Sequence, residues 1–183
     1  PTAISYDVVK CGNSYGVVYE MLNAKTLAQI VEEDPKKIPE ISRKAAELLK
    51  NLHKIVPGSE AKLPDRKQEV MKWLDDISEN LTKEETEKLK NFVKNIPDRD
   101  TFLHGDYNFK NIMSKDGEIQ LIDIGTAAVG HPIFDIGFCM MFFVLFPNVY
   151  DPEIIPERRR IRYLIGFDIE NTREVWSVIC SAY

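Results

Sequence analysis

The stretch from residue 102 to residue 125 constrains the fold of this chain more than any other. It reads FLHGDYNFKNIM, SKDGEIQ and LIDIG, so a polar loop and a turn separate apolar runs. The Asp116–Gly117 pair between two such runs is a strong signal for a β-hairpin. That hairpin would fold Asp123 back beside the loop that carries Asp106 and Asn111. The sequence therefore predicts two carboxylates and a carboxamide at one end of a small sheet.

These oxygen donors suit Mg²⁺ bound to a nucleotide. Mg²⁺ prefers oxygen ligands and usually takes one or two carboxylates together with phosphate oxygens. Asp123 and Asn111 could hold such ions, which would leave Asp106 free to accept a proton from a hydroxyl group. The order of these residues is that of the catalytic segment of protein kinases, where a loop Asp is the base and Asn and a later Asp bind metal.

Three motifs together resemble the aminoglycoside phosphotransferase family, in the choline-kinase-like branch of the protein-kinase fold. They are HGDYNFKN at residues 104–111, LIDIG at residues 121–125 and GHPIFDIG at residues 130–137. They follow the order and spacing of that family, and the resemblance extends from about Tyr6 to the end of the chain. It implies an α+β, protein-kinase-like fold: a mostly helical carboxy-terminal lobe preceded by the last strands of a truncated amino-terminal lobe.

The resemblance also assigns roles to individual residues. Asp106 would be the catalytic base, and Asn111 and Asp123 would be the metal ligands. Asp123 could instead be a capping carboxylate, but an unpaired charge among the apolar neighbours of LIDIG would be costly. His104 would be a structural residue beneath the loop. Asp135 would support the loop backbone as well as complement the start of a helix.

A nucleotide site is implied by the segment VYEML at residues 18–22, which matches the hinge strand between the lobes of a kinase. Backbone groups around Glu20, Met21 and Leu22 would bind the base of ATP or GTP. Lys110 could add a cation near the transferred phosphate, although a solvated lysine fits this position equally well.

The domain organisation follows from the same comparison. Residues 1–22 would be the remnant of the amino-terminal lobe with the hinge, and residues 23–183 the helical catalytic lobe. Such a kinase also uses a glycine-rich loop, a strand lysine and a helix glutamate. Only two strands precede the hinge here, and Lys10 lies on the wrong one of them. We therefore expect a fragment that is inactive by itself, with a protein that works without this lobe as the alternative.

The apolar spacing predicts the remaining elements. Strands are expected at residues 6–11 and 16–22, and a capping box at Thr82–Glu85 should open a helix. His53 should be solvated or paired with a helix dipole. Trp73 and Ile77 should lie on one face of their helix, and Leu89 and Phe92 should be buried. The expected helices cover residues 26–33, 40–55, 66–81, 83–96, 133–146 and 174–182, with another starting at Pro156.

Composition limits the partners. The net charge of -5 gives no reason to expect nucleic acid or an anionic membrane as a partner. The apolar run 136–146 is too short to span a bilayer and reads as a buried helix. Three widely spaced cysteines, Cys11, Cys139 and Cys180, lack the spacing of a metal site and suggest reduced core thiols in a cytoplasmic protein. The sequence does not set the oligomeric state.

The function expected from these features is Mg²⁺-assisted transfer of the γ-phosphoryl group of ATP or GTP to a hydroxyl of a small molecule. The acceptor could be aminoglycoside-, choline- or sugar-like. Asp151, Glu153 and Glu157 would make its pocket acidic, but arginines at 158–160 and 162 oppose that. The alternative is a catalytically silent kinase-like module that binds a nucleotide or a partner.

Overall fold

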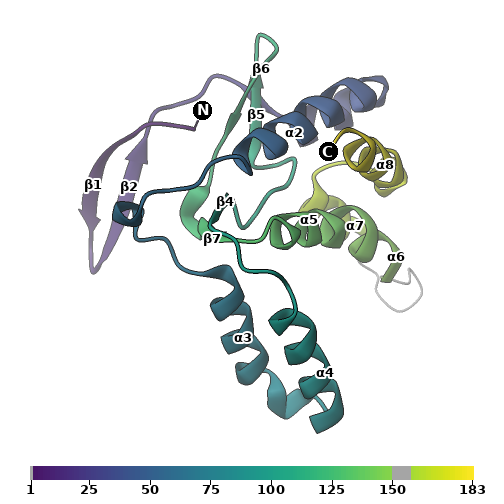
Figure 1. Cartoon of the computed structure of the whole chain (residues 1–183). Coiled ribbons are helices and arrows are strands. Elements are labelled where there is room, and N and C mark those ends of the chain that lie inside the picture. The colour runs from purple at the N-terminus through teal and green to yellow at the C-terminus, as the bar shows by residue number, and fades with distance from the viewer. Residues whose placement is uncertain (1, 150–157) are drawn as a thin grey trace.

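The computed structural model describes residues 2–149 and 158–183. Its strands lie between Ser5 and Thr26 and between Thr101 and Gly130, and helices form most of the remainder (Figure 1). The strands are β1 (Ser5–Cys11), β2 (Ser14–Tyr19), β3 (Lys25–Thr26), β4 (Thr101–Leu103), β5 (Ile112–Lys115), β6 (Glu118–Leu121) and β7 (Ala128–Gly130). The α-helices are α1 (Leu27–Glu33), α2 (Ile38–Leu52), α3 (Arg66–Asp76), α4 (Lys83–Lys94), α5 (Ile133–Met140), α6 (Phe146–Val149), α7 (Arg158–Ile165) and α8 (Thr172–Ala182). This composition confirms the predicted α+β class.

The first hairpin stands apart from the helices. Strands β1 and β2 pair antiparallel, with Val8 opposite Val17, and the pair projects to one side in Figure 1. The predicted hairpin is therefore confirmed, but β2 ends at Tyr19 and does not continue to Leu22. The chain leaves the strand at Glu20, whose side chain accepts a hydrogen bond from the backbone of Ile4 at 2.9 Å.

The second hairpin carries the residues of the predicted site. Strands β5 and β6 pair antiparallel from Ile112 opposite Leu121 to Lys115 opposite Glu118. The connecting residues Asp116 and Gly117 have φ values of 52° and 85°. Positive φ at both central residues defines the type I′ turn, which matches the twist of paired strands. The hairpin predicted from the Asp-Gly pair is confirmed.

Helix capping explains several of the boundaries. At Thr82 the predicted capping box opens α4, because the Thr82 hydroxyl accepts from the backbone of Glu85 and the Glu85 carboxylate accepts in return. Thr26 and Gln29 form the same reciprocal cap at the start of α1. Helix α2 ends at Leu52, before the predicted end at Ile55, and α8 begins at Thr172, before the predicted start at Glu174.

The core lies between α1, α2, α8 and the loop that follows β4. Two aromatic residues of this loop are buried, and the ring of Phe109 packs 5.2 Å from Phe143 and 6.0 Å from Phe167. Burial of each large apolar side chain stabilises the fold by roughly 1.5–3 kcal/mol. The loop is therefore held by the core rather than exposed on its surface. Fully buried members include Leu27, Val31, Ile38, Leu49, Tyr107, Phe109 and Phe167.

Helices α3 and α4 form a hairpin that extends away from the core (Figure 1). The two helices contact each other, yet Trp73, Ile77 and Leu89 are about half exposed and Phe92 is 68% exposed. The prediction that Leu89 and Phe92 are buried is wrong. Helical spacing shows that a face is apolar but not whether another element covers it. Helix α3 also ends at Asp76 instead of Leu81.

The apolar segment after Ile133 is helical but not one regular helix. Helix α5 is followed by a π-helical segment, Met141–Leu145, and then by α6. Pro147 lies inside α6 and was expected to begin a loop. A proline ring clashes with the carbonyl four residues earlier in a regular α-helix, and the wider π-helical turn relieves that contact. Within residues 2–149 and 158–183, no helix combines the length and the hydropathy that a membrane span requires.

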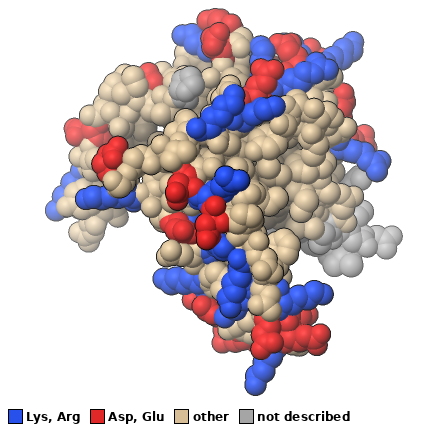
Figure 2. Space-filling view, in the orientation of Figure 1, with Lys and Arg blue, Asp and Glu red and all other residues tan. Residues whose placement is uncertain are grey.

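The surface of the described residues carries charges of both signs. On the face shown in Figure 2, Lys and Arg side chains of the described residues are interspersed with Asp and Glu side chains. Most of the loop expected at residues 147–156 lies outside the described residues, as do Asp151, Glu153 and Glu157. The side chains of residues 158–160 lie outside them too.

Candidate active site

The side chain of His104 holds the loop between β4 and β5 through hydrogen bonds. Its imidazole is fully buried, and its Nε2 lies 3.1 Å from the carbonyl oxygen of Ile122. Its Nδ1 lies 3.3 Å from the backbone nitrogen of Asp106 and accepts that N–H. The ring therefore bridges the loop to the segment that precedes Asp123. The sequence predicts a structural, hydrogen-bonding role for His104, and these two contacts are the ones that such a role would use.

Asp135, at the start of α5, holds the same loop from another side. Its carboxylate is 1% exposed and accepts the backbone N–H groups of His104 at 2.9 Å and Gly105 at 2.8 Å. Gly105 has φ +83°, and a Cβ there would lie 2.2 Å from the carbonyl oxygen of Thr126. Only glycine fits this turn, which brings the backbone against its neighbour and orients the next residue, Asp106.

Two further contacts hold the loop against the helices. The hydroxyl of Tyr107 donates to the carbonyl of Ala45 at 2.6 Å, and the Cys139 thiol donates to the carbonyl of Tyr107 at 3.3 Å. Burial raises the pKa of both groups, so each remains a protonated donor at neutral pH. Cys139 is the buried thiol that was predicted, whereas Cys11 and Cys180 are exposed.

Asp106 is oriented by two neighbouring amides. Its Oδ1 accepts from Asn108 at 2.8 Å and its Oδ2 accepts from Asn111 at 2.7 Å. The predicted role of Asp106 as a base stays a prediction, and these two amides are partners that the sequence did not indicate. Each carboxylate oxygen has two acceptor directions, so one direction per oxygen remains for a substrate hydroxyl. The two amides fix the plane of the carboxylate without occupying it completely.

A backbone hydrogen bond brings the chain next to Asp123 against Asn111. The N–H of Ile122 donates to the carbonyl of Asn111 at 3.0 Å, which places the two predicted metal ligands on neighbouring chain segments. The amide nitrogen of Asn111 donates to Asp106, so the side-chain oxygen is the donor atom that Asn111 can offer a cation. Asp123 has left-handed backbone angles, φ 57° and ψ 57°. Asp tolerates this region better than bulkier residues do.

The carboxylate of Asp123 is exposed, which corrects one step of the sequence argument. An unpaired charge among buried apolar neighbours would be costly, but β6 ends at Leu121 and the chain turns before Asp123. The apolar residues on either side of Asp123 belong to the end of a strand and to a short 3₁₀ segment, not to a buried strand. Its charge therefore faces solvent and a cavity, where a cation can approach it.

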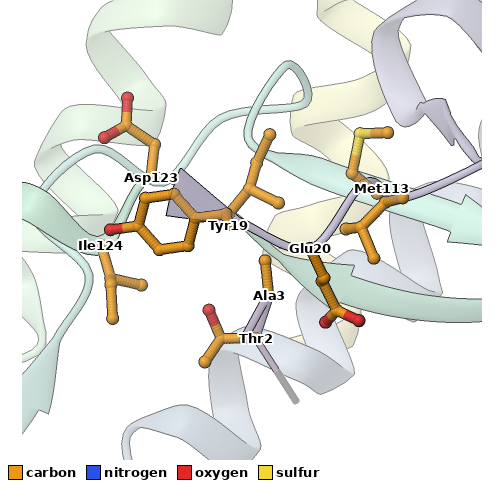
Figure 3. Close-up of a pocket in the computed structure, with 9 residues that line it drawn as sticks. Thr2, Ala3, Tyr19, Glu20, Met113, Asp123 and Ile124 are labelled. Carbon is orange, nitrogen blue, oxygen red and sulfur yellow. The ribbon is translucent and has the colours of Figure 1, made fainter. Parts of the chain in front are cut away.

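That cavity has a volume of about 390 Å³ and lies between the two hairpins. Figure 3 shows Asp123 and Ile124 towards one end of it and Glu20 and Met113 towards the other. The described residues that line it include no lysine or arginine. They are Thr2, Ala3, Tyr19, Glu20, Leu22, Met113, Ile122, Asp123 and Ile124.

The predicted hinge segment meets the cavity through two of its three residues. Glu20 and Leu22 line it, whereas Met21 is 96% exposed and does not. The backbone N–H of Glu20 donates to Ile4 at 2.9 Å and is therefore occupied. Among the described residues, the backbone groups of Met21 and Leu22 make no hydrogen bond to other backbone groups.

Lys110 is not brought to the cavity. Its ammonium group donates to the carbonyl of Tyr163 at 3.2 Å and lies 4.9 Å from the centroid of the Tyr163 ring. The lysine thus ties the loop to α7 through a hydrogen bond and a cation–π contact. The structure places the group away from the residues expected to bind the nucleotide.

His53 is the site residue that sequence reasoning missed. It was expected to be solvated, but its side chain is 4% exposed. Its Nε2 lies 3.1 Å from Oδ2 of Asp135, and its Nδ1 lies 2.8 Å from the hydroxyl of Tyr183. The partners are 82 and 130 residues away in the sequence, so no local pattern could reveal them.

Comparison with known proteins identifies the family. The model of the phosphotransferase enzyme family, APH, matches residues 6–173. This chain belongs to that family. No curated protein sequence gives a match.

Solved structures place the phosphotransferase in the protein-kinase-like fold. One is a thermostable mutant of aminoglycoside phosphotransferase APH(4)-Ia in a ternary complex with ADP and hygromycin B. It has a TM-score of 0.59 and 11% identity, over 100% of this chain and 76% of that one. An ethanolamine kinase from Plasmodium vivax has a TM-score of 0.52 and 16% identity, over 97% of this chain and 58% of that one. At such identities the likeness shows the fold alone, and it confirms the predicted fold.

The contacts of Asp135 predict a large effect on the stability of the phosphotransferase. Asp135→Ala would leave the N–H groups of His104 and Gly105 and the His53 imidazole without their acceptor. Removing one partner of a buried charged network typically costs about 3–5 kcal/mol. We expect a loss of that size in the free energy of unfolding, measured by urea denaturation.

A matched control uses an exposed, ion-paired aspartate. The Asp98 side chain is 90% exposed and pairs with Lys67 at 2.8 Å, so Asp98→Ala should change stability by less than about 1 kcal/mol. Equal losses for the two variants would show that Asp135 does not hold the loop.

Proposed function

We propose that this phosphotransferase transfers the γ-phosphoryl group of ATP or GTP, assisted by Mg²⁺, to a hydroxyl group of a small molecule. The observation that carries the proposal is the single cavity lined both by Glu20 and Leu22 and by Asp123. Family membership supports small-molecule phosphotransfer in general. Within this scheme residues 1–22 form the hinge side of the site and residues 23–183 the catalytic lobe.

The purine of the nucleotide would lie against the apolar wall of the cavity. Leu22, Met113 and Ile122 supply that wall, which suits a flat ring. The backbone groups of Met21 and Leu22 would bind the edge of the base. Backbone recognition of this kind does not by itself separate adenine from guanine, so ATP and GTP both remain donors in the proposal.

The donor atoms of Asp123, which lies on the other side of the cavity, and of Asn111, which does not line the cavity, fit Mg²⁺. Asp123 offers an exposed carboxylate and Asn111 an amide oxygen, and Mg²⁺ usually takes one or two protein ligands with phosphate oxygens. The described residues contain no cluster of three or more His, Cys, Asp or Glu side chains that could enclose a metal by themselves. When bound, the ion would neutralise negative charge on the phosphates.

Asp106 would act on the acceptor. The acceptor oxygen attacks the γ-phosphorus, the bond from that phosphorus to the β,γ-bridging oxygen breaks, and ADP or GDP leaves. The proton of the acceptor hydroxyl passes to the Asp106 carboxylate. The hydrogen bonds from Asn108 and Asn111 keep this carboxylate in one plane, so that it presents a fixed lone pair to the hydroxyl.

The acceptor belongs to the class of small alcohols. Aminoglycoside-, choline- and sugar-like acceptors all carry such a hydroxyl. Hygromycin B is bound in one solved relative, and this supports including aminoglycosides among the compounds tested. We propose no choice among these classes, because the acidic residues expected at the acceptor pocket lie outside the described residues.

A test of the metal assignment compares Asp123→Ala with Asn111→Ala. We expect Asp123→Ala to weaken Mg²⁺-dependent nucleotide binding far more, because a carboxylate supplies a full charge and an amide only a dipole. Calorimetric titration of nucleotide with and without Mg²⁺ measures the difference. Asp76→Ala is the control, since Asp76 is an exposed residue on α3 away from the cavity. Equal and small effects at Asp123 and Asn111 would mean that the hairpin carboxylate is structural.

The second candidate function is a catalytically silent module that binds a nucleotide or a partner. Two observations favour it: Lys110 lies against Tyr163, and the cavity lining contributed by the described residues contains no lysine or arginine. The two functions differ in one observable. The silent module would bind Mg-nucleotide in the full-length protein and yield no phosphorylated product with any hydroxyl acceptor.

A further inference from the structure

A part-buried chain of hydrogen bonds runs from the end of α8 to the loop between β4 and β5, the proposed catalytic loop. It begins at Tyr183, the residue that follows α8, whose hydroxyl lies 2.8 Å from Nδ1 of His53. It continues through His53 Nε2, which lies 3.1 Å from Asp135, and Asp135 accepts the N–H groups of His104 and Gly105. Tyr183, His53 and Asp135, which are far apart in the sequence, thus form one chain of contacts that ends at Gly105, next to Asp106.

With a neutral imidazole, the chemistry of the groups sets the direction of each bond. A carboxylate only accepts, so Nε2 of His53 must donate to Asp135. In a neutral imidazole the other nitrogen is then an acceptor, and Tyr183 must donate to it. Burial and the nearby charge of Asp135 raise the pKa of Tyr183, which keeps the hydroxyl protonated. A phenol hydroxyl donates a hydrogen bond more strongly than it accepts one, so Tyr183 favours the tautomer of His53 that can bond to Asp135.

We propose that Tyr183 is a positioning residue for the catalytic loop, acting through His53 and Asp135. This inference rests on the proposed function, in which Asp106 on that loop activates the acceptor. With the opposite tautomer, a nitrogen lone pair of His53 would face the Asp135 carboxylate and repel it. The carboxylate would then hold the loop backbone less firmly, and the orientation of Asp106 would be less well defined.

A purely structural role for Tyr183 must be separated from this one. Its ring packs edge-on against His53, with centroids 5.7 Å apart, and also lines an apolar cavity of about 150 Å³ with Leu49 and Trp176. Tyr183→Phe keeps the ring and these contacts and removes only the hydroxyl. Tyr15→Phe is the matched control, because Tyr15 is 74% exposed on β2 and does not line the larger cavity.

The tautomer can be measured directly by NMR on the isotope-labelled 183-residue chain, which contains three histidines. Proton–nitrogen correlation spectra at neutral pH distinguish Nε2–H from Nδ1–H rings. His104 is an internal reference, since its Nε2 also donates, to Ile122. We expect His53 to carry its proton on Nε2 in the wild type and in Tyr15→Phe. In Tyr183→Phe we expect the tautomer ratio to shift roughly twofold to tenfold, the range given by one net hydrogen bond.

Two further readouts follow the effect to the loop. Amide exchange at His104 and Gly105 should accelerate by a similar factor in Tyr183→Phe. In the full-length protein kcat should fall by about that factor, while KM for the nucleotide is unchanged. A His53 spectrum identical in wild type and Tyr183→Phe would overturn the proposal, as would a shifted tautomer with unchanged amide exchange. If the wild-type full-length protein transfers no phosphate, the proposed function fails, and the NMR and exchange results alone decide whether Tyr183 positions the loop.

Discussion

Replacing Asp106 with Asn or Ala in the full-length protein is expected to lower turnover by roughly 10²–10⁴ with little change in nucleotide affinity. Removal of a general base gives losses of this size. The carboxylate is the only oxygen donor of the predicted set that is assigned to the acceptor. Asp123, by contrast, lines the cavity that we propose for the nucleotide. Loss of Asp106 should therefore affect the chemical step and leave nucleotide binding intact.

The two substitutions test different parts of this argument. Asp106→Asn keeps the shape of the side chain, whereas Asp106→Ala also removes the acceptors of Asn108 and Asn111. Steady-state kinetics and calorimetric nucleotide binding on both variants separate loss of the base from loss of loop order. Asp76→Asn, at an exposed site, should match the wild type. A variant that retains more than about half of the wild-type activity would remove Asp106 from the mechanism.

The 183-residue chain alone is expected to fold but to show no measurable phosphotransfer. Folding is expected because the buried cluster already unites α1, α2, α8 and the catalytic loop. We expect the chain to be inactive because the described cavity lining supplies no positive charge for the phosphates. A triphosphate needs cations along its length, yet the described lining of the cavity contains none and Lys110 is bound to Tyr163. Positioning and electrostatic stabilisation supply nearly all of the catalysis in phosphoryl transfer.

The size of this effect can be bounded. One catalytic arginine is worth roughly 10³–10⁵ in kcat in related chemistry, and kinases commonly turn over at about 1–100 s⁻¹. We therefore expect the purified chain to be at least about 10³ slower than that range, while urea unfolding remains cooperative. Turnover within the usual range would contradict the charge argument and would mean that the chain holds the phosphates with groups not assigned to that task here.

The parts of the fold that could be predicted depend on local signals. The turn at Asp116–Gly117 requires two residues with positive φ, and this pair of residue types supplies them. The capping box at Thr82 depends on groups three residues apart. The loop motif likewise places His104, Asp106 and Asn111 within one short segment, so their proximity follows from the chain itself.

The parts that could not be predicted depend on contacts between distant segments. The pairing of His53 with Asp135 and Tyr183 exists only because α2, α5 and α8 pack together. The exposure of Phe92 depends on what covers α4, and the spacing of its apolar residues carries no information about that. The sequence is compatible with Lys110 as a phosphate ligand or as a solvated lysine. It gives no sign of the contact between Lys110 and Tyr163 on α7.

Phosphotransfer by this protein is expected to depend on the carboxylate of Asp106. The most direct measurement incubates the full-length protein with ATP or GTP, Mg²⁺ and a panel of amino-sugar, amino-alcohol and sugar acceptors, and detects phosphate monoesters by phosphorus NMR. We expect a new monoester with at least one acceptor in the wild type and none above background with Asp106→Asn. Equal monoester formation by the two proteins would contradict the account.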